Sequence, residues 1–176
     1  MQTGLAPTGI RDALDRYERP LLRFASTIVG KDTAADVVQD VFLELVREPW
    51  EKVEGHLAAW LFTVCRNKAI SHRRKSARHT DLEEDVVPEE LDRGPDRALE
   101  KKEAGARIAK AMATLSERDR EIVALKFAGG LSYKEIADVT KLSVSHVGVI
   151  LHEALKKVRE RVGQAERVQG MQRRTV

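Results

Sequence analysis

The sequence predicts an all-α protein made of two small helical domains joined by an acidic linker, with a helix-turn-helix in the C-terminal domain. Three observations support this fold class. Apolar residues recur at spacings of three and four along most of the 176-residue chain, as on one face of a helix. Aromatic residues make up only 5%, which is few for a β-sandwich or barrel. Residues 79–96 interrupt the helical pattern with acidic residues and proline.

The composition excludes several classes of protein. No apolar run approaches the length of a membrane span, and the opening residues lack the basic and apolar regions of a signal peptide. The single cysteine, Cys65, cannot form an internal disulfide or a thiolate metal cluster. We therefore expect a soluble cytoplasmic protein with no membrane insertion, no metal site and no other cofactor.

Charge is segregated along the chain, although the net charge is only +3. Residues 60–78 hold six basic residues and no acid, residues 79–92 hold seven acids and neither Lys nor Arg, and the C-terminal part is again rich in Lys and Arg. This order favours two basic modules joined by an acidic tether. The predicted divisions are a first domain at 9–78, a flexible linker at 79–96, a second domain at 97–163 and a disordered tail at 164–176.

The first domain is expected to open with a helical stripe from Leu14 to Ile28, kinked or restarted at Pro20. Asp32 is predicted to cap the next helix, which runs to about Arg47. One face of that helix holds the apolar residues Ala35, Val38, Val41, Phe42 and Leu45. The other face holds Asp36, Gln39, Asp40 and Glu44, with Leu43 among them, and suits a basic partner helix.

A basic helix is predicted to follow a loop of about ten residues, from Pro49 to Ala59. The expected buried side of this helix consists of Trp60, Leu61, Val64 and Ile70. The expected outer side consists of Arg66, Asn67, Arg73 and Arg74. Because cations neutralise phosphates and asparagine pairs with base edges, this outer side predicts nucleic-acid binding.

The C-terminal domain holds the most specific local pattern. Ser116 is predicted to cap a helix that runs through Phe127 and is stopped by Gly129 and Gly130. Ser132 with Glu135 forms a capping box for a short helix over 133–140. A turn at 141–143 leads to a longer helix capped by Ser143. Short helix, tight turn and longer helix are typical of a helix-turn-helix. Its outer face is predicted to hold Ser145, His146, Val149, His152, Glu153 and Lys156.

The order of these motifs resembles the extracytoplasmic-function class of bacterial sigma factors. The resemblance covers about residues 9–163. It rests on Arg19-Pro-Leu-Leu-Arg-Phe-Ala25, Ala35-Asp-Val-Val-Gln-Asp-Val-Phe42, Trp60-Leu61 with Asn67, Leu115-Ser-Glu-Arg-Asp-Arg-Glu121 and Ser132-Tyr-Lys-Glu-Ile-Ala137. It implies a transcription initiation factor, not an enzyme, that brings core RNA polymerase to specific promoters and opens the minus-ten element.

The resemblance also implies roles for individual residues. Docking on the clamp helices of the polymerase β′ subunit falls to Asp36, Gln39, Asp40, Leu43 and Glu44. Binding of the minus-ten element, with a flipped base held by the loop before the basic helix, falls to Trp50, His56, Trp60, Arg66, Asn67, Arg73 and Arg74. Reading of the minus-thirty-five element falls to Ser132, Ser143, Ser145, His146, Val149, His152 and Lys156. Further partners implied are the polymerase flap, promoter DNA and an anti-sigma factor.

The last helix departs from the pattern of the family, which commonly has Lys or Arg where this chain has Gly148, Ile150 and Glu153. Fewer cations make fewer phosphate contacts, so we expect weak or unusual recognition of the upstream element. The turn residue that is often Gly in the family is Lys141, where a left-handed conformation would be unfavourable by about 1–2 kcal/mol.

Two other classes of protein fit the sequence less well. A dimeric helix-turn-helix repressor that senses a ligand would need a long apolar dimer face and an apolar pocket, whereas residues 60–78 are basic. An enzyme would need a catalytic constellation, but the sequence shows no Ser/His/Asp or Cys/His set, glycine-rich phosphate loop or metal-spaced cluster. The repressor is therefore the alternative to the sigma factor.

Overall fold

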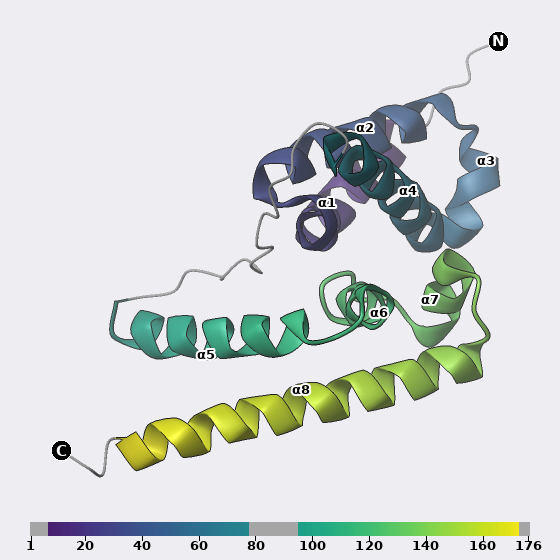
Figure 1. Cartoon of the computed structure of the whole chain (residues 1–176). Helices are drawn as coiled ribbons and strands as arrows, with labels where there is room; N and C mark the ends of the chain where they lie inside the picture. Colours follow the sequence, from purple (N-terminus) through teal and green to yellow (C-terminus); the bar gives the residue numbers. More distant parts are fainter. Residues whose placement is uncertain (1–6, 78–94, 173–176) are drawn as a thin grey trace.

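The computed structural model describes residues 7–77 and 95–172, and all its regular elements in these ranges are helices. Figure 1 shows two groups of helices, one above the other, with the long last helix at the bottom of the lower group. The first group contains α1 (Pro7–Val29), α2 (Lys31–Arg47), α3 (Trp50–Val53), the 3-10 helix η1 (Glu54–His56) and α4 (Leu57–Ala77). The second contains α5 (Pro95–Ala113), α6 (Glu117–Phe127), α7 (Tyr133–Thr140) and α8 (Val144–Gln172). The all-α prediction is confirmed for the described residues.

Helices α1, α2 and α4 pack against one another around one apolar core. The rings of Phe24 and Phe62 meet edge to face, with their centroids 5.5 Å apart. Cys65 is fully buried beside them, as a small apolar residue would be. The largest side chains of this part of the core are Leu21, Phe24, Val37, Val41, Leu45, Leu61 and Phe62.

The structure corrects several details of the first domain. Helix α1 continues through Pro20, so no second helix starts there. Helix α2 begins after Gly30, which occupies the N-cap position with a φ of 79° that glycine adopts readily. Asp32 therefore lies inside the first turn and is not the cap. Ala34 is buried and Ala35 is exposed, the reverse of the predicted face. The predicted loop before α4 is mostly helical, since α3 and η1 fill residues 50–56.

The buried side of α4 is also turned slightly from the prediction. Leu61 is fully buried as expected, but Trp60, Val64 and Ile70 are only half-buried. The positions that complete the buried side are Ala59, Phe62, Cys65 and Ala69. Small residues, Cys65 and Ala69, are thus more deeply buried than the larger Val64 and Ile70. The size of the apolar side chains alone did not identify the buried side of α4.

The helix-turn-helix has the predicted local geometry. Ser116 caps α6 by accepting a hydrogen bond from the Asp119 amide, and Ser132 and Glu135 form the complete capping box of α7. Lys141 follows α7 in the left-handed conformation, with φ of 59°. The Ser143 hydroxyl then accepts a hydrogen bond from the His146 amide at the start of α8. These bonds satisfy the amides that each helix start leaves free.

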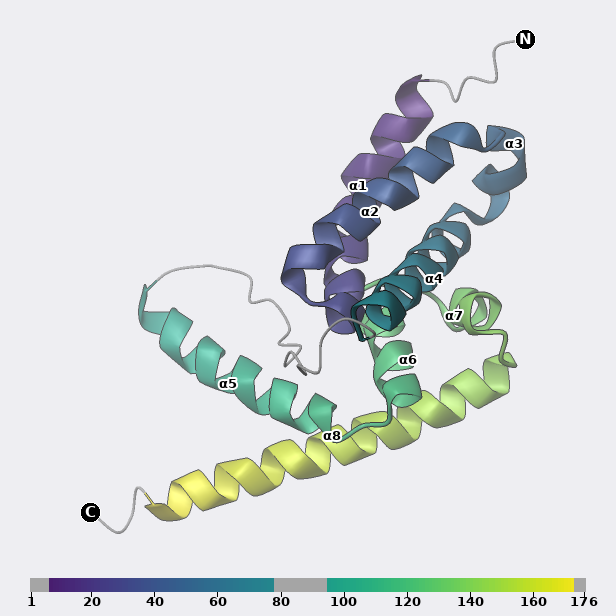
Figure 2. The same cartoon turned by 45° about the horizontal axis from the view of Figure 1, so that its top comes forward.

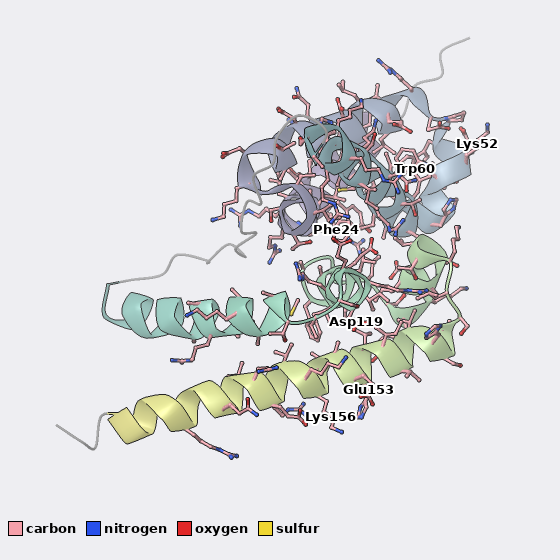
Figure 3. The ribbon with its side chains drawn as sticks, in the orientation of Figure 1. Phe24, Lys52, Trp60, Asp119, Glu153 and Lys156 are labelled. Atoms are coloured by element: carbon pink, nitrogen blue, oxygen red, sulfur yellow. The ribbon has the colours of Figure 1, made fainter. Side chains whose placement is uncertain are left out.

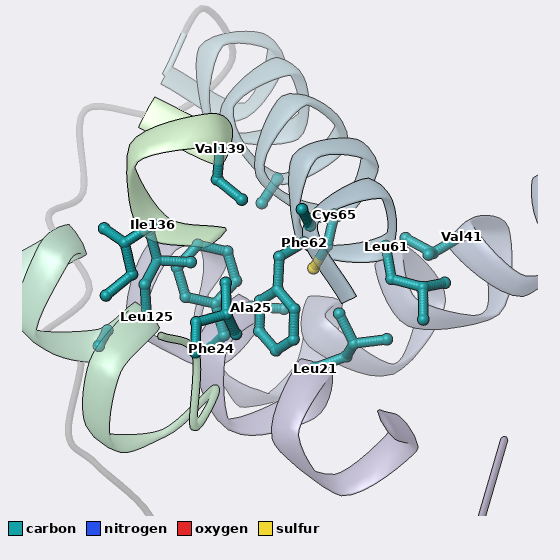
Figure 4. Close-up of a cluster of buried hydrophobic side chains, with 14 of the residues drawn as sticks. Leu21, Phe24, Ala25, Val41, Leu61, Phe62, Cys65, Leu125, Ile136 and Val139 are labelled. Atoms are coloured by element: carbon teal, nitrogen blue, oxygen red, sulfur yellow. The ribbon is translucent and has the colours of Figure 1, made fainter. Parts of the chain in front are cut away.

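The two halves of the chain share one apolar cluster. Helix α7 packs on α4, and α6 packs on α1. Leu125, Ile136 and Val139 therefore lie in the same cluster as Phe24 and Phe62, as Figure 4 shows. Figure 2 shows the same arrangement from another angle: α6 and α7 lie beneath α4. Helix α5 lies along α8.

Two predicted boundaries have different outcomes. The predicted disorder from residue 164 is wrong as far as Gln172, because α8 continues as a helix to that residue. The acidic linker lies outside the described residues except for its last two positions, Pro95 and Asp96, which begin α5. Proline is well suited to the first turn of a helix, where its missing amide proton has no partner to lose.

Candidate functional site

The outer face of α2 is an exposed acidic surface. Asp36, Gln39 and Asp40 are exposed there, and half of the surface of Leu43 is accessible to solvent. Glu44 is half-buried because Lys68 of α4 pairs with it, at 2.8 Å between Nζ and Oε2. The five residues expected to dock on polymerase thus form one continuous stripe along α2. Four of them are exposed to solvent, and Glu44 is held in an ion pair with Lys68.

A groove beside this stripe was missed by the sequence analysis. It lies between α1 and α2 and has a volume of about 450 Å³. Its apolar lining consists of Ile10, Leu14, Leu22, Ala35, Val38, Phe42, Leu43 and Val46. Val46 is 49% exposed although it is large and apolar. The sequence already indicated an exposed apolar residue here, because Leu45 and Val46 are consecutive and only one of them can face the protein core from a helix.

The residues expected to bind the minus-ten element fall into three sets. His56, Asn67 and Arg74 are exposed. Trp50 and Trp60 are half-buried against the edge of the core, and Figure 3 shows Trp60 at the end of α4 near α3. The remaining two, Arg66 and Arg73, do not project freely outward as predicted.

Arg66 and Arg73 are bound by carboxylates of α6. The guanidinium of Arg66 forms a bidentate ion pair with Glu121, with Nη2 donating to Oε2 at 3.3 Å and Nε donating to Oε1. Arg73 donates from Nη2 to Oε2 of Glu117 at 3.1 Å. These pairs join residues 55 and 44 positions apart in the sequence, so no local pattern could have predicted them.

The residues expected to read the minus-thirty-five element gather around the start of α8. Ser132 and Ser143 are exposed and also cap α7 and α8. Val149 is 60% exposed, as a residue that meets a thymine methyl group would be. Ser145, His146, His152 and Lys156 are exposed on the same helix. In Figure 3 the side chains of Glu153 and Lys156 point away from α6.

Other kinds of site have little support among the described residues. No group of three or more His, Cys, Asp or Glu side chains in residues 7–77 and 95–172 is arranged to hold a metal ion. Burial raises the pKa of the Cys65 thiol from 9.0 to about 12, so the reactive thiolate is scarce at neutral pH. None of the described helices is both long and apolar enough to cross a membrane.

Models of two protein families match the chain, in the order of its two halves. The family described as Sigma-70 region 2 matches residues 13–79, and the family described as Sigma-70, region 4 matches residues 105–158. The first match holds most of α1 with α2, α3 and α4, and the second holds the end of α5, then α6, α7 and the first half of α8. The two expected DNA-binding faces therefore lie in different family regions.

Characterised proteins of similar sequence span most of the chain. The chain is 31% identical over 163 residues to the ECF RNA polymerase sigma factor SigL of Mycobacterium tuberculosis, which covers 85% of this chain and 86% of that protein. It is 33% identical over 134 residues to the ECF RNA polymerase sigma factor SigF of Caulobacter vibrioides, with 74% and 72% covered. It is 28% identical to the ECF RNA polymerase sigma factor RpoE of Cereibacter sphaeroides, with 86% and 90% covered.

Two solved structures are similar in fold. One is the sigma factor RpoE in complex with the anti-sigma factor NepR from Bartonella quintana, with a TM-score of 0.64, 25% identity, and coverage of 89% of this chain and 97% of that one. The other is CnrH in complex with the cytosolic domain of CnrY, with a TM-score of 0.63, 23% identity and 89% of each chain covered.

Proposed function

The chain belongs to the extracytoplasmic-function sigma factors, and from this premise we propose how its surfaces divide the work. As a member of this family the protein is a transcription initiation factor that directs core RNA polymerase to promoter DNA. We propose that residues 9–78 act as region 2, that residues 97–163 act as region 4 and that residues 79–96 link them. The free-standing repressor is not favoured, because region 2 has no place in it.

We propose that the acidic stripe on α2 docks on the polymerase clamp. The observation that supports this is the exposure of Leu43 among Asp36, Gln39 and Asp40, since a large apolar side chain ringed by acids suits a basic partner helix. The adjoining groove gives apolar side chains of that partner a place to bury. The acids would speed association, and the apolar contact would slow dissociation.

The test is co-elution of the purified chain with core RNA polymerase in size-exclusion chromatography. The wild-type chain should elute with the enzyme, and the double variant Asp40→Ala/Leu43→Ala should bind at least about tenfold more weakly, since central apolar contacts dominate interfaces. Asp138→Ala, an exposed change on α7, is the matched control and should bind as the wild type does. Equal binding by all three chains would remove the docking assignment.

We propose that α4 and the helical segment before it bind and open the minus-ten element. His56 and Asn67 are exposed for contacts with bases, and Arg66, Arg73 and Arg74 supply cations for phosphates. Trp50 and Trp60 are half-buried at the edge of the core, so part of each ring is available to stack on an unpaired base. Stacking on an aromatic ring is worth about 1–3 kcal/mol per base. It would offset much of the few kcal/mol that unpairing a base requires.

We propose that the start of α8 reads the minus-thirty-five element in the major groove. Ser145, His146, Val149 and His152 present one exposed face there, and the first turns of a recognition helix are the part that meets base edges. Lys156 lies further along the same face and suits a phosphate. The capping serines Ser132 and Ser143 would approach the sugar-phosphate backbone.

We also propose regulation by an anti-sigma factor, since the two similar solved structures described above are complexes, one of them with a named anti-sigma factor. Sigma factors act on transcription without catalysing a reaction of their own, which agrees with the lack of a catalytic constellation in the sequence. A protein that works on RNA polymerase is expected in the cytoplasm, without a bound cofactor.

A further inference from the structure

An acidic residue, Glu153, lies on the surface of α8 that faces DNA in the proposed function. Glu153 is exposed, and it lies on the same side of the helix as His146, Val149 and Lys156, at spacings of three and four. The buried residues of α8 lie on the opposite side, where α5, α6 and α7 pack against the helix. The carboxylate of Glu153 would therefore meet any duplex that the helix enters, and it would repel the phosphates of that duplex.

Neither lysine within one turn of Glu153 neutralises its charge. The favourable helical pair would join Glu153 to Lys157, four residues further along. Lys157 instead lies near α6, with its Nζ 3.9 Å from Oδ2 of Asp119. Lys156 is exposed, and the side chains of Glu153 and Lys156 both point away from α6 in Figure 3. Within the described part of the chain Glu153 has no hydrogen bond or ion pair, so its oxygens are free to accept from a ligand.

The major groove of DNA offers a carboxylate one well-matched base. An ionised carboxylate accepts hydrogen bonds and donates none. Guanine presents two acceptors in the groove, thymine an acceptor and a methyl group, and adenine an acceptor beside its amino group, whereas cytosine presents only its N4 amino donor. We propose that Glu153 determines specificity in the upstream element, by accepting a hydrogen bond from the N4 amino group of a cytosine. This inference rests on the proposed reading of that element by α8.

The geometry of α8 indicates where the cytosine lies. Glu153 follows Val149 by four residues, which is about 6 Å along the helix at 1.5 Å per residue. Base pairs are stacked about 3.4 Å apart, so the cytosine is expected about two base pairs from the thymine whose methyl group meets Val149. Lys156 lies one turn beyond Glu153 and suits a phosphate at the edge of the groove.

A carboxylate at this position increases selectivity at the expense of general affinity. At a site without the cytosine, Glu153 loses water, finds no donor and remains beside the phosphates. At the correct site the N4 amino group supplies the missing donor. The expected weak binding of α8 to DNA in general and its discrimination of one base thus have the same physical cause.

The first experiment compares base preferences. Holoenzymes formed by core RNA polymerase with each full-length chain select sites from a randomised duplex library, and the enriched sites are sequenced. The wild type should enrich cytosine at one upstream position at least about fivefold over each other base, as one specific contact provides. Glu153→Gln should change that preference to adenine, because glutamine pairs with N6 and N7 of adenine. Glu160→Gln removes the same charge from an exposed position further along α8, and this matched control should leave the motif unchanged.

The second experiment removes the donor from the DNA instead of the acceptor from the protein. A selected duplex is made with N4-methylcytosine at the assigned position, so that the remaining N4 hydrogen pairs with guanine and the methyl group occupies the major groove. The wild-type holoenzyme should bind this duplex at least about fivefold more weakly than the unmodified one. Glu153→Ala has no acceptor to lose and should bind the two duplexes equally. Each holoenzyme is compared with itself, so a change in folding cannot produce the difference.

The outcomes separate this inference from the proposed function on which it rests. If Glu153→Gln enriches the same motif as the wild type and binds all sequences more tightly, the carboxylate only repels DNA and the inference is overturned. Equal weakening of the wild type and Glu153→Ala by the methylated base would also overturn it. In both cases a motif that is altered by Val149→Ala preserves the reading role of α8, whereas a library that yields no upstream motif overturns that role as well. A preference that passes from cytosine to adenine in Glu153→Gln alone supports the inference.

Discussion

The ring of Phe62 lies so close to Gly129 that a β-carbon added there would stand 2.8 Å from Cε1 of the ring. The same β-carbon would stand 2.7 Å from the carbonyl oxygen of Leu125 and 2.9 Å from Cδ1 of Leu131. Glycine is therefore required at the point where the helix-turn-helix meets the first domain. Its role is close approach, and the neighbouring Gly130 supplies the positive φ of the turn.

Gly129→Ala is expected to destabilise the chain by about 1–3 kcal/mol, because the added methyl group overlaps a backbone oxygen that cannot move alone. The measurement is the urea midpoint followed by circular dichroism. Gly163→Ala is the control, since no heavy atom lies within 4 Å of its added β-carbon and alanine favours a helix. A Gly129→Ala chain as stable as the control would show that the contact adjusts freely.

Asn67→Ala is expected to impair promoter opening by about tenfold while leaving the affinity for core polymerase unchanged. Asn67 is exposed on α4 and lies off the α2 stripe, and a base contact is worth about 1–3 kcal/mol. Permanganate reactivity of unpaired thymines measures opening, and size-exclusion chromatography measures polymerase binding. Ser71→Ala, an exposed change one turn further along α4, is the control. Equal losses in both assays would count against a specific role in opening.

Lys141→Gly is expected to stabilise the helix-turn-helix by about 1 kcal/mol, because Lys141 adopts a left-handed conformation that only glycine accepts without strain. Gly130→Ala should do the opposite, since its φ is 71°. Thermal unfolding of both variants beside the wild type measures this: the melting temperature should rise in Lys141→Gly and fall in Gly130→Ala. Unchanged melting in both would mean that the turn relaxes without strain.

Gly148→Lys is expected to strengthen binding of the upstream element and to steepen its salt dependence by about 0.9 in log affinity against log salt, as one added phosphate contact would. Space allows the change, since the new β-carbon would lie 3.7 Å from the Tyr133 ring, an ordinary contact. Promoter binding by the holoenzyme is titrated from low to moderate salt. Gly163→Lys adds the same charge further along α8 and should leave the slope unaltered.

Cys65 is expected to make the stability of the protein depend on alkaline pH. The folded pKa of about 12 lies above the ordinary value of 9.0, so the folded state retains the proton that the unfolded state releases. The contribution is complete below pH 9 and is lost between pH 9 and 12, with about 1 kcal/mol gone by pH 10. Urea unfolding at pH 8 and pH 10 should show this loss in the wild type relative to Cys65→Ala. The thiol should also react with a disulfide reagent only on unfolding, and rapid labelling of the folded chain would contradict both expectations.

Local interactions explain what the sequence predicted well. The limits of α6 and α7, their caps and the turn at Lys141 depend on residues within four positions of one another, so the pattern of Ser, Glu and Gly is sufficient. The predicted start of α2 is wrong by two residues because Gly30, and not Asp32, occupies the N-cap position. The positive φ of Gly30 breaks the chain between α1 and α2 before Asp32 is reached. The segment 50–56 lacks periodicity over a window long enough to reveal such short helices.

Contacts between the halves could not be predicted from any local pattern. Arg66 looked like a free cation in mid-helix, and only the fold brings Glu121 to it from 55 residues away. The same holds for Phe62, whose neighbour Gly129 had been interpreted as a helix stop alone. The exposed stripe on α2 was predictable because a helix wheel already separates Leu43 from the buried positions.

Helix α8 is one continuous rod of 29 residues, about 43 Å long at the usual rise of 1.5 Å per residue. His146 and Val149 lie at one end of it, and Gln172 lies at the other. A rod of this length is a lever, in which a tilt of about 10° at the promoter end moves the far end by about 7 Å. A fluorophore at the far end would therefore report, as a magnified displacement, how this helix settles into the groove of the DNA.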